Sequence, residues 1–304
     1  MTFVATANVV RYCQAFPIFI DIEPNYLTLD IEKVKSFFEN ECIHKTEGLY
    51  NKSSGRKVRG IIPVHLFGHP VDMSSLLGLA SKYNLFVLED ATEAIGSKIM
   101  DQSAGTLGQI GVYSFNGNKM ITTGGGGMVV TNDESLAKRI HHLTTQAKAQ
   151  GYEYYHTEIG YNYRMTNIQA AIGLAQLEQL DNFVQKRREI SFFYRNQLFQ
   201  VEDIRTQRDA LWAFNDCWLS WIILENDMSK RKNELIEYLN SENIQVRPLF
   251  VPLNTLPPYQ DCVSYMIESA PFMYNSGLNL PSHTNLNSDD LNRVVDTIKS
   301  FLLG

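Results

Sequence analysis

A lysine, a hydroxyl group and a run of glycines stand together in the segment SFNGNKMITTGGGG, residues 114–127. Such a segment can hold a phosphate with its backbone amides while it presents an amine beside that phosphate. It is not a P-loop, because Lys119 precedes the glycines and no Ser or Thr follows it directly. A lone lysine is usually a solvated surface side chain, so a second signal is needed before chemistry is assigned to Lys119.

The second signal is Asp90, which ends the apolar run LFVLED. Open α/β sheets bind their ligands at the carboxyl ends of their strands. On position alone, this carboxylate could hold a metal, orient a ribose or pair with a protonated ring nitrogen. With Asp90 and the glycine run in the same sequence, Lys119 is better explained as a lysine that forms a Schiff base with an aldehyde than as a surface lysine.

The elements that must position these residues alternate between strands and helices. Short, nearly continuous apolar runs predict strands that are buried in a parallel sheet. We expect strands at 58–68, 84–91, 111–115 and 125–131, and helices at 73–83 and 133–146. The first helix begins after Asp72, which can cap it. The alternation predicts an α/β fold with an open, mostly parallel sheet and helices on both faces.

The pattern changes after Thr166. Residues 167–198 show apolar residues at helical spacing over a long stretch, which predicts a helix that connects two domains. Beyond it, we expect strands at 218–225 and 244–250 and helices at 229–243 and 289–303. The sequence therefore predicts a large domain over residues 1–180 and a smaller α+β domain, with the end of the connecting helix, over residues 181–304.

Composition excludes several classes of protein. The chain has 304 residues, of which 44% are hydrophobic, so it can bury a core. Its 27 Lys and Arg against 33 Asp and Glu, with no basic block, argue against nucleic-acid binding. Its four cysteines have neither zinc-site nor disulfide-framework spacing. No basic leader and no apolar run of about 18 residues is present, so we expect a cytoplasmic protein without a membrane span.

Five blocks make the sequence resemble the DegT/DnrJ/EryC1/StrS family of fold type I, pyridoxal phosphate-dependent sugar aminotransferases. The blocks are TFVATANVV (2–10), PVHLFGHPVDM (63–73), VLEDATEAIGS (87–97), SFNGNKMITTGGGGMVVTND (114–133) and GYNYRMTNIQAAIGLAQLEQL (160–180). The resemblance covers essentially the whole chain, and the five blocks in this order are highly specific. The variants EDATEA, SFNGNK and TTGGGGM are most similar to the branch that aminates nucleotide-linked 4-keto-6-deoxy sugars for legionaminic-acid-type nonulosonic acids.

The resemblance implies a role for four residues around the cofactor. Lys119 matches the lysine that binds pyridoxal 5'-phosphate covalently, and its released amine would move the proton in catalysis. Asp90 would pair with the pyridine nitrogen, which keeps the ring an electron sink. Ser114 would hydrogen-bond the cofactor phosphate. Glu93 takes the place of a common Gln near the phenolic oxygen, where an ionised carboxylate accepts a proton but cannot donate one.

Two further residues acquire cofactor-binding roles only through the resemblance. Phe3 matches the aromatic residue that stacks on the cofactor ring, although a core position explains it equally well from the sequence alone. Asn162 matches the residue that reaches the cofactor phosphate of the partner subunit, and Arg164 follows it. Without the resemblance, both would be assigned to a loop and a helix cap. No role is assigned to nearby polar residues, namely His65, His141, His142, Tyr161 and Arg247.

The function implied by the resemblance is transamination of a nucleotide-linked 4-keto-6-deoxy sugar to a 4-amino sugar, with L-glutamate as the usual donor. This reaction belongs to bacterial surface-polysaccharide or nonulosonic acid biosynthesis. The family implies a homodimer with shared active sites and no metal. Sugar dehydration by relatives uses His where this chain has Lys119, which argues against that activity. A dinucleotide-binding oxidoreductase is also disfavoured, because no G-x-G-x-x-G follows the strands at 58–68 or 84–91.

The chain departs from the family pattern at its start. Members carry a substantial segment before TFVAT, including a Gly-Thr phosphate-binding turn, whereas Met1 stands directly before that block here. A fragment, a gene model that begins at an internal codon and a natural remnant all stay open as explanations. The competing hypothesis is accordingly a truncated, catalytically incompetent relative that folds or dimerises without productive cofactor binding.

Overall fold

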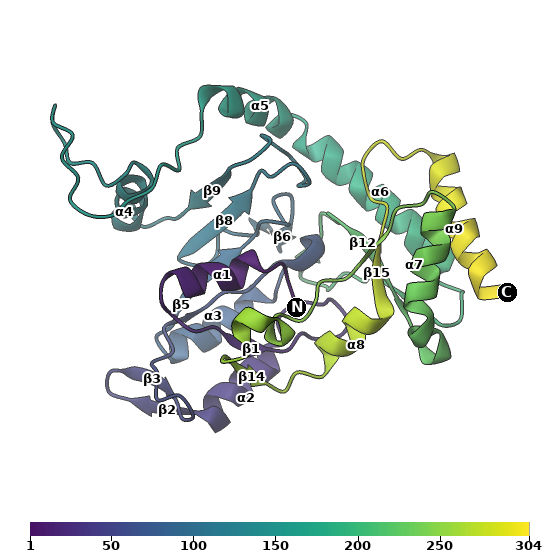
Figure 1. Ribbon diagram of the computed structural model, residues 1–304, viewed down its shortest axis with the longest axis horizontal. Helices are drawn as coiled ribbons and strands as arrows, with labels where there is room; N and C mark the ends of the chain where they lie inside the picture. Colours follow the sequence, from purple (N-terminus) through teal and green to yellow (C-terminus); the bar gives the residue numbers. More distant parts are fainter. Residues whose placement is uncertain (304) are drawn as a thin grey trace.

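The computed structural model describes residues 1–303, whose arrangement is shown in Figure 1. Its α-helices are α1 (Ala5–Tyr12), α2 (Ile31–Glu41), α3 (Met73–Lys82), α4 (Glu134–Thr144), α5 (Asn167–Leu177), α6 (Leu180–Leu198), α7 (Lys232–Ser241), α8 (Ser269–Ser276) and α9 (Ser288–Leu303). Its strands are β1 (Ile18–Ile20), β2 (Cys42–Lys45), β3 (Gly48–Asn51), β4 (Gly60–Ile61), β5 (Phe86–Asp90), β6 (Lys98–Ile99), β7 (Gln102–Ser103), β8 (Ile110–Ser114), β9 (Gly127–Val130), β10 (Ile204–Thr206), β11 (Ala213–Phe214), β12 (Ser220–Leu224), β13 (Arg247–Pro248), β14 (Val263–Tyr265) and β15 (Gly277–Leu280). Short 3₁₀ turns are η1 (Leu66–Gly68), η2 (Asn226–Arg231), η3 (Leu253–Thr255) and η4 (Pro257–Tyr259).

The sheet that carries the candidate site has the order β4-β5-β8-β9. The pairs β4–β5 and β5–β8 are parallel, whereas β8 and β9 run antiparallel. Asp90 lies opposite Val112 in the β5–β8 pair, so Ser114 follows two residues further along β8. Parallel pairing therefore brings the ends of β5 and β8 to the same edge of the sheet, and the expected mostly parallel α/β arrangement is confirmed.

The strand expected at 58–68 is much shorter than predicted. Only Gly60–Ile61 pairs as β4, at the edge of the sheet, and residues 66–68 form η1. Phe67 and Gly68 both have left-handed backbones, with φ of 54° and 95°. A side chain at Gly68 would place its Cβ 2.1 Å from Asp216 Oδ1, so this turn requires glycine. The apolar run thus ends in a buried turn rather than in a longer strand.

The long helix expected at 167–198 is two helices. α5 ends at Leu177 and α6 begins at Leu180, with Gln179 between them in a non-helical conformation (φ −103°, ψ 1°). Thr166 and Gln169 form a capping box that starts α5. The predicted cap Asp72 is confirmed, because it accepts from Ser75 N–H. The structure also shows that Asp133 caps α4, since it accepts from the N–H groups of residues 135 and 136.

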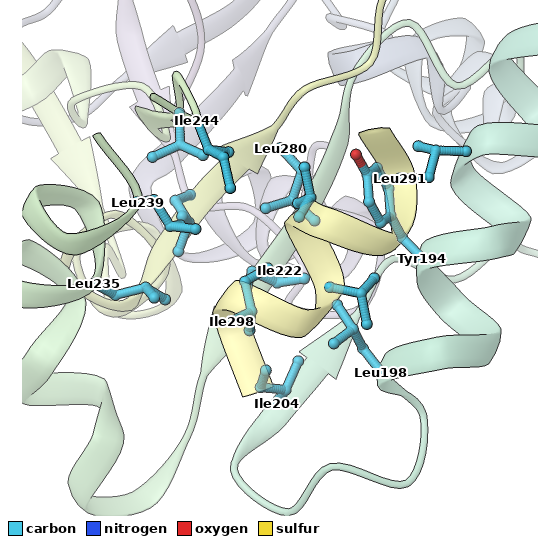
Figure 2. Close-up of a cluster of buried hydrophobic side chains, with 14 of the residues drawn as sticks. Tyr194, Leu198, Ile204, Ile222, Leu235, Leu239, Ile244, Leu280, Leu291 and Ile298 are labelled. Carbon is cyan, nitrogen blue, oxygen red and sulfur yellow. The ribbon is translucent and has the colours of Figure 1, made fainter. Parts of the chain in front are cut away.

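Buried side chains gather in separate clusters along the chain. One cluster takes residues between Val34 and Ala104, from α2, α3, β5 and their neighbours. Another takes only residues from 190 to 298, and Figure 2 shows Tyr194, Leu198 and Ile298 of this cluster converging from α6 and α9. A third joins the two halves, because it contains residues from both η1 and β12. The boundary at residue 180 stays a prediction.

Contacts far apart in the sequence also tie the two halves together. β1 pairs in parallel with β14, and β6 pairs antiparallel with β11. α6 runs diagonally between α5 and the C-terminal helices (Figure 1).

The four cysteines are free thiols. Among the described residues, no helix has the length and apolar character needed to cross a membrane.

Candidate active site

Asp90 ends β5 as a buried carboxylate whose two oxygens are both engaged. The hydroxyl of Thr6, in α1, donates to Oδ2 at 2.6 Å, and the backbone N–H of Thr92 donates to Oδ1 at 3.2 Å. Only 7% of Asp90 is exposed. The backbone of Asp90 pairs with that of residues 63–65. The carboxylate is therefore fixed in direction before any ligand binds.

Lys119 lies in the loop after β8, and its amine is held between an acid and an aromatic ring. Nζ is 3.4 Å from Glu93 Oε1 and 4.2 Å from the centroid of the Trp218 ring. The side chain of Lys119 is 13% exposed. The amine is thus shielded but still reachable, which suits a lysine that must react with an aldehyde rather than a solvated surface lysine.

Glu93 joins Lys119 and Asp90 electrostatically. Its Oε2 accepts the backbone N–H of Phe67 at 2.9 Å, and only 4% of the residue is exposed. Burial raises the pKa of Glu93 to about 7, although Lys119 and the Phe67 N–H act in the opposite direction. The negative charge of Asp90 raises this pKa further. Near neutral pH, the carboxyl can therefore donate a proton as well as accept one, which the sequence comparison with Gln did not anticipate.

A second buried pair supports the strand directly behind Asp90. Glu89 and His65 are both fully buried, and His65 Nε2 lies 2.9 Å from Glu89 Oε2. His65 Nδ1 accepts the N–H of Val71 at 3.0 Å, so Nε2 carries the proton and donates it to Glu89. Burial alone would raise the pKa of Glu89, but hydrogen bonds from His65 and from the backbone N–H groups of residues 105, 107 and 108 outweigh it and lower that pKa. His65 is a structural support for β5.

Ser114 and the glycine run lie where β8 and β9 meet. Ser114 is half-buried, pairs with Gly127, and accepts the Asn116 N–H at 3.3 Å. Gly124 and Gly126 have φ of 75° and 112°, conformations that favour glycine. The N–H of Gly124 already donates to Thr122 Oγ1 at 2.9 Å. The glycines form the turn from the lysine loop into β9, and Ser114 supplies a half-buried hydroxyl at the end of β8.

Phe3 lies on the surface rather than in the core. It is 57% exposed, and its ring centroid is 6.0 Å from that of Phe250, which in turn stacks on Phe67. Phe3 lies two residues before α1, whose Thr6 bonds to Asp90. The core interpretation of Phe3 is therefore wrong, while its stacking on a cofactor ring stays a prediction.

Asn162 lies apart from the other predicted residues within this chain. It is exposed and forms an isolated antiparallel bridge with Thr145 after α4. In the described part of the chain, no hydrogen bond joins Asn162 to Asp90, Ser114 or Lys119. Arg164 is exposed nearby, and Arg247 is exposed on β13. The structure thus brings Asp90, Glu93 and Lys119 together and leaves Asn162 outside that group.

Sequence reasoning missed two residues of this site. Thr6 lies inside the block TFVAT, so its polar side chain near Phe3 was the available signal. Trp218 is about a hundred residues from Lys119, and no local pattern connects them. We call Asp90, Glu93, Lys119 and Trp218 the Lys119 corner. Among residues 1–303, no group of His, Cys, Asp or Glu side chains has the arrangement of a metal site.

An open α/β sheet with a fixed carboxylate at a strand end and a shielded, reachable amine beside it defines an enzyme of the lysine-dependent, cofactor-binding class. The family model described as the DegT/DnrJ/EryC1/StrS aminotransferase family matches residues 1–299. The chain belongs to this family, and it is a pyridoxal phosphate-dependent aminotransferase.

Three relatives are identical to the chain at about a third of the aligned positions. The putative pyridoxal phosphate-dependent aminotransferase EpsN of Bacillus subtilis is 36% identical over 98% of this chain and 74% of its own length. The GDP-perosamine synthase of Escherichia coli O157:H7 is 36% identical over 99% and 77%. The dTDP-4-amino-4,6-dideoxy-D-glucose transaminase of Shigella dysenteriae is 31% identical over 99% and 77%. The chain therefore spans about three quarters of each relative.

A solved structure shows the same fold. The DegT DnrJ EryC1 StrS aminotransferase from Brucella abortus superposes with a TM-score of 0.88 and is 27% identical, over 99% of this chain and 77% of its own. The fold type I assignment is confirmed.

The donor set of the Lys119 corner fits pyridoxal phosphate. A fixed carboxylate such as Asp90 suits a protonated ring nitrogen, and a shielded amine such as Lys119 suits the aldehyde. Glu93 is close enough to both for their charges to act on its pKa, and its carboxyl could exchange a hydrogen bond with the cofactor's phenolic oxygen. Ser114 adds a half-buried hydroxyl for the phosphate.

Proposed function

We propose that the chain transfers an amino group from L-glutamate to a nucleotide-linked 4-keto-6-deoxy sugar and so forms a 4-amino sugar. Glutamate becomes 2-oxoglutarate as the ketone becomes an amine, so the exchange is balanced. The placement of Lys119 against Glu93, near Asp90, carries this proposal. We place the reaction in the cytoplasm, in the biosynthesis of a bacterial surface polysaccharide or a nonulosonic acid.

Three residues of the corner, together with Ser114, have a task in this reaction. Pyridoxal phosphate supplies the electron sink and carries the amino group between donor and acceptor. Lys119 binds it covalently and, as a free amine, removes and returns the proton at the reacting carbon. Asp90 holds a proton on the ring nitrogen, and Ser114 binds the phosphate. Glu93, whose pKa lies near 7, donates or accepts at the phenolic oxygen.

The names of the relatives support the class of substrate. One relative is named as a GDP-perosamine synthase, and another is named as a transaminase for a dTDP-linked 4-amino-4,6-dideoxy sugar. They share a nucleotide-linked sugar and differ in the nucleotide. We therefore propose the 4-keto-6-deoxy sugar as the acceptor and leave the nucleotide to the experiment below. The legionaminic branch stays a prediction from the blocks EDATEA, SFNGNK and TTGGGGM.

We also propose that two copies of the chain form a homodimer through an apolar surface around α5. None of the residues of α5 is buried, although Ile168, Ile172, Leu174 and Leu177 project from it. The loop before α5 exposes further apolar side chains, at Tyr152, Tyr154, Tyr155, Ile159, Tyr161 and Tyr163. We call these two sets the α5 face. In Figure 1, α4, the loop and α5 lie along the outer edge of the molecule.

A second copy explains both this surface and the position of Asn162. The α5 face gathers many exposed apolar side chains on adjoining segments, and such a patch is typical of a protein–protein interface. Asn162 lies within this face and away from Lys119 of its own chain. In a symmetric dimer the same patch serves both copies, so Asn162 would reach the cofactor phosphate of the partner. The shared active site expected from the family then uses exposed residues that have no role in one copy.

The experiment supplies the purified chain with pyridoxal phosphate, L-glutamate that carries a labelled amino nitrogen, and 4-keto-6-deoxy sugars linked to GDP, dTDP or UDP. Mass spectrometry then follows labelled amino sugar and 2-oxoglutarate. We expect both products in equal amounts from one of the three acceptors. Lys138→Ala, which removes an exposed lysine of α4, is the control for Lys119→Ala and should leave the amounts of both products unchanged.

Formation of 2-oxoglutarate with no amino sugar from any acceptor would overturn the proposed sugar. Formation of neither product would favour the competing hypothesis, a relative that folds without productive cofactor binding, which the comparisons do not favour.

A further inference from the structure

Trp218 packs its indole face against the amine of Lys119. The ring centroid lies 4.2 Å from Nζ, and Trp218 is 3% exposed. On its other side, the amine faces the carboxyl of Glu93 at 3.4 Å. An ammonium group is attracted to an aromatic face, and the attraction grows as the pair is removed from water. The amine therefore has a defined resting place between a ring and a carboxyl.

Hydrogen bonds fix the indole in this position. Its Nε1–H donates to the backbone carbonyl of Asn118 at 3.0 Å, beside Lys119 itself. The backbone N–H of Trp218 donates to Asp216 Oδ1 at 3.0 Å, and its carbonyl accepts from Arg187 Nη1 at 2.7 Å. The ring is thus anchored both to the lysine loop and to the C-terminal half of the chain.

The same anchor reaches the turn that carries Glu93. Asp216 is fully buried, and its Oδ2 accepts the N–H of Gly96 at 3.1 Å. Its own N–H donates to the hydroxyl of Ser97 at 3.0 Å. Because Asp216 holds both Trp218 and residues 96–97, the ring and the carboxyl on the two sides of Lys119 keep a fixed spacing.

We propose that Trp218 is a positioning residue for Lys119, and that its indole face holds the lysine amine beside Glu93 whenever that amine is not bonded to the cofactor. The proposal rests on the proposed function, in which Lys119 is released to move a proton in each half of the reaction. A four-carbon side chain without such a support would sample many rotamers and leave the reacting carbon. Trp218 limits this freedom without blocking the bond to the cofactor, because the contact between the π face and the amine is not covalent and can be released.

The test compares three purified variants with the natural chain in the absence of cofactor. Trp218→Leu removes the π face, whereas Trp218→Phe keeps a π face and loses the indole N–H. Trp221→Leu is the matched control, because Trp221 is equally buried at 2% exposed and no cation–π contact joins it to Lys119 in residues 1–303. Each protein is treated briefly with acetic anhydride. Peptide mass spectrometry gives the acetylation of Lys119 relative to the exposed Lys138.

We expect Trp218→Leu to raise the relative acetylation of Lys119 roughly three- to tenfold, because the ammonium form loses its partner and the amine loses its shield. Trp218→Phe should change it less than about twofold. Trp221→Leu should leave it at the natural value. Equal increases in the Trp218→Leu and Trp221→Leu variants, or no increase in Trp218→Leu, would overturn the proposal. Should Trp218→Leu lose its cooperative thermal transition, Trp218→Met is judged by the same limits.

A parallel measurement separates this proposal from the proposed function. The natural chain is mixed with pyridoxal phosphate, reduced with borohydride and mapped for labelled lysines. Labelling at a lysine other than Lys119 would overturn the role of Lys119, and with it the catalytic purpose of the Trp218 contact. Labelling at Lys119 together with unchanged acetylation in Trp218→Leu would overturn the Trp218 proposal alone.

Discussion

The side chains of the Lys119 corner are largely buried and held by contacts within the chain, whereas those of the α5 face are exposed. In the corner, Asp90 has both oxygens bonded, Glu93 takes a backbone N–H, and Lys119 lies between Glu93 and Trp218. On the α5 face, Ile168 is 77% exposed and no residue of the helix is buried. The chain itself organises the first region, whereas the second would be covered only in the proposed homodimer. If that proposal holds, one copy positions the Lys119 corner and a second copy is needed to complete the site.

The largest expected effect comes from removing the amine of the corner. Lys119→Ala should lower kcat/KM for amino transfer by at least about 10⁴-fold, because it removes both the covalent link and the proton shuttle. Steady-state release of 2-oxoglutarate measures it. Lys119→Arg keeps the charge but cannot form the covalent link, so it should be equally inactive. Activity of either variant within tenfold of the natural chain would show that the corner is not the reacting centre.

The second prediction asks how far the order of the corner depends on the buried support behind Asp90. Glu89→Gln should lower the free energy of unfolding by about 3 kcal/mol, because an amide N–H₂ would then face backbone N–H donors in a fully buried place. Urea unfolding measures the loss. Glu134→Gln on exposed α4 is the control and should change stability by less than about 0.5 kcal/mol. Equal effects of the two substitutions would contradict a buried support.

The third prediction concerns the α5 face. Ile168→Asp combined with Ile172→Asp should raise the dissociation constant of the dimer roughly a hundredfold. The fold should stay intact, because both side chains are exposed in one copy. Light scattering over a range of protein concentrations measures the dissociation. Leu211→Asp, at a fully exposed leucine outside the face, is the control. If the natural chain stays monomeric at every concentration, the α5 face is not a dimer interface.

How much of this comparison the sequence allowed depends on the distance over which each contact acts. Asp90, Ser114 and Lys119 lie in short blocks at the ends of neighbouring strands, so local patterns and the resemblance located them together. Trp218 and Thr6 reach the site only through tertiary contacts, which no periodicity reports.

Helix limits followed the same rule. The cap Asp72 was predicted correctly because capping is local. The apolar run 58–68 misled the strand prediction, since the left-handed turn at Phe67 and Gly68 serves packing against Asp216 far along the chain. The break at Gln179 also went unseen, because the residues around it are ordinary helix formers.

The smallest expected effect is the pH dependence of Glu93. Its pKa rises from 4.5 in the unfolded chain to about 7 in the folded chain, so the folded state binds more protons between these values. Stability from Glu93 is therefore present in full below about pH 4.5 and is lost as the pH rises through about 7. Glu93→Gln removes this dependence.

Urea unfolding at several pH values measures the difference in stability between the natural chain and Glu93→Gln. We expect this difference to fall as the pH rises from 4.5 through about 7, and to level off only about one pH unit higher, once Glu93 is ionised in the folded chain as well. Asp216, whose pKa burial also raises to about 7, is present in both proteins and does not contribute to the difference. A difference that stays constant, or that grows with pH, would mean that Glu93 is not a buried acid of the corner.

The most direct test of the central claim is the site of cofactor attachment. The purified chain is mixed with pyridoxal phosphate, reduced with borohydride and digested, and the labelled lysines are mapped by mass spectrometry. The account predicts one label per chain, confined to Lys119, and no label there in Lys119→Arg. Scattered labelling of exposed lysines such as Lys138, with Lys119 unmodified, would contradict it.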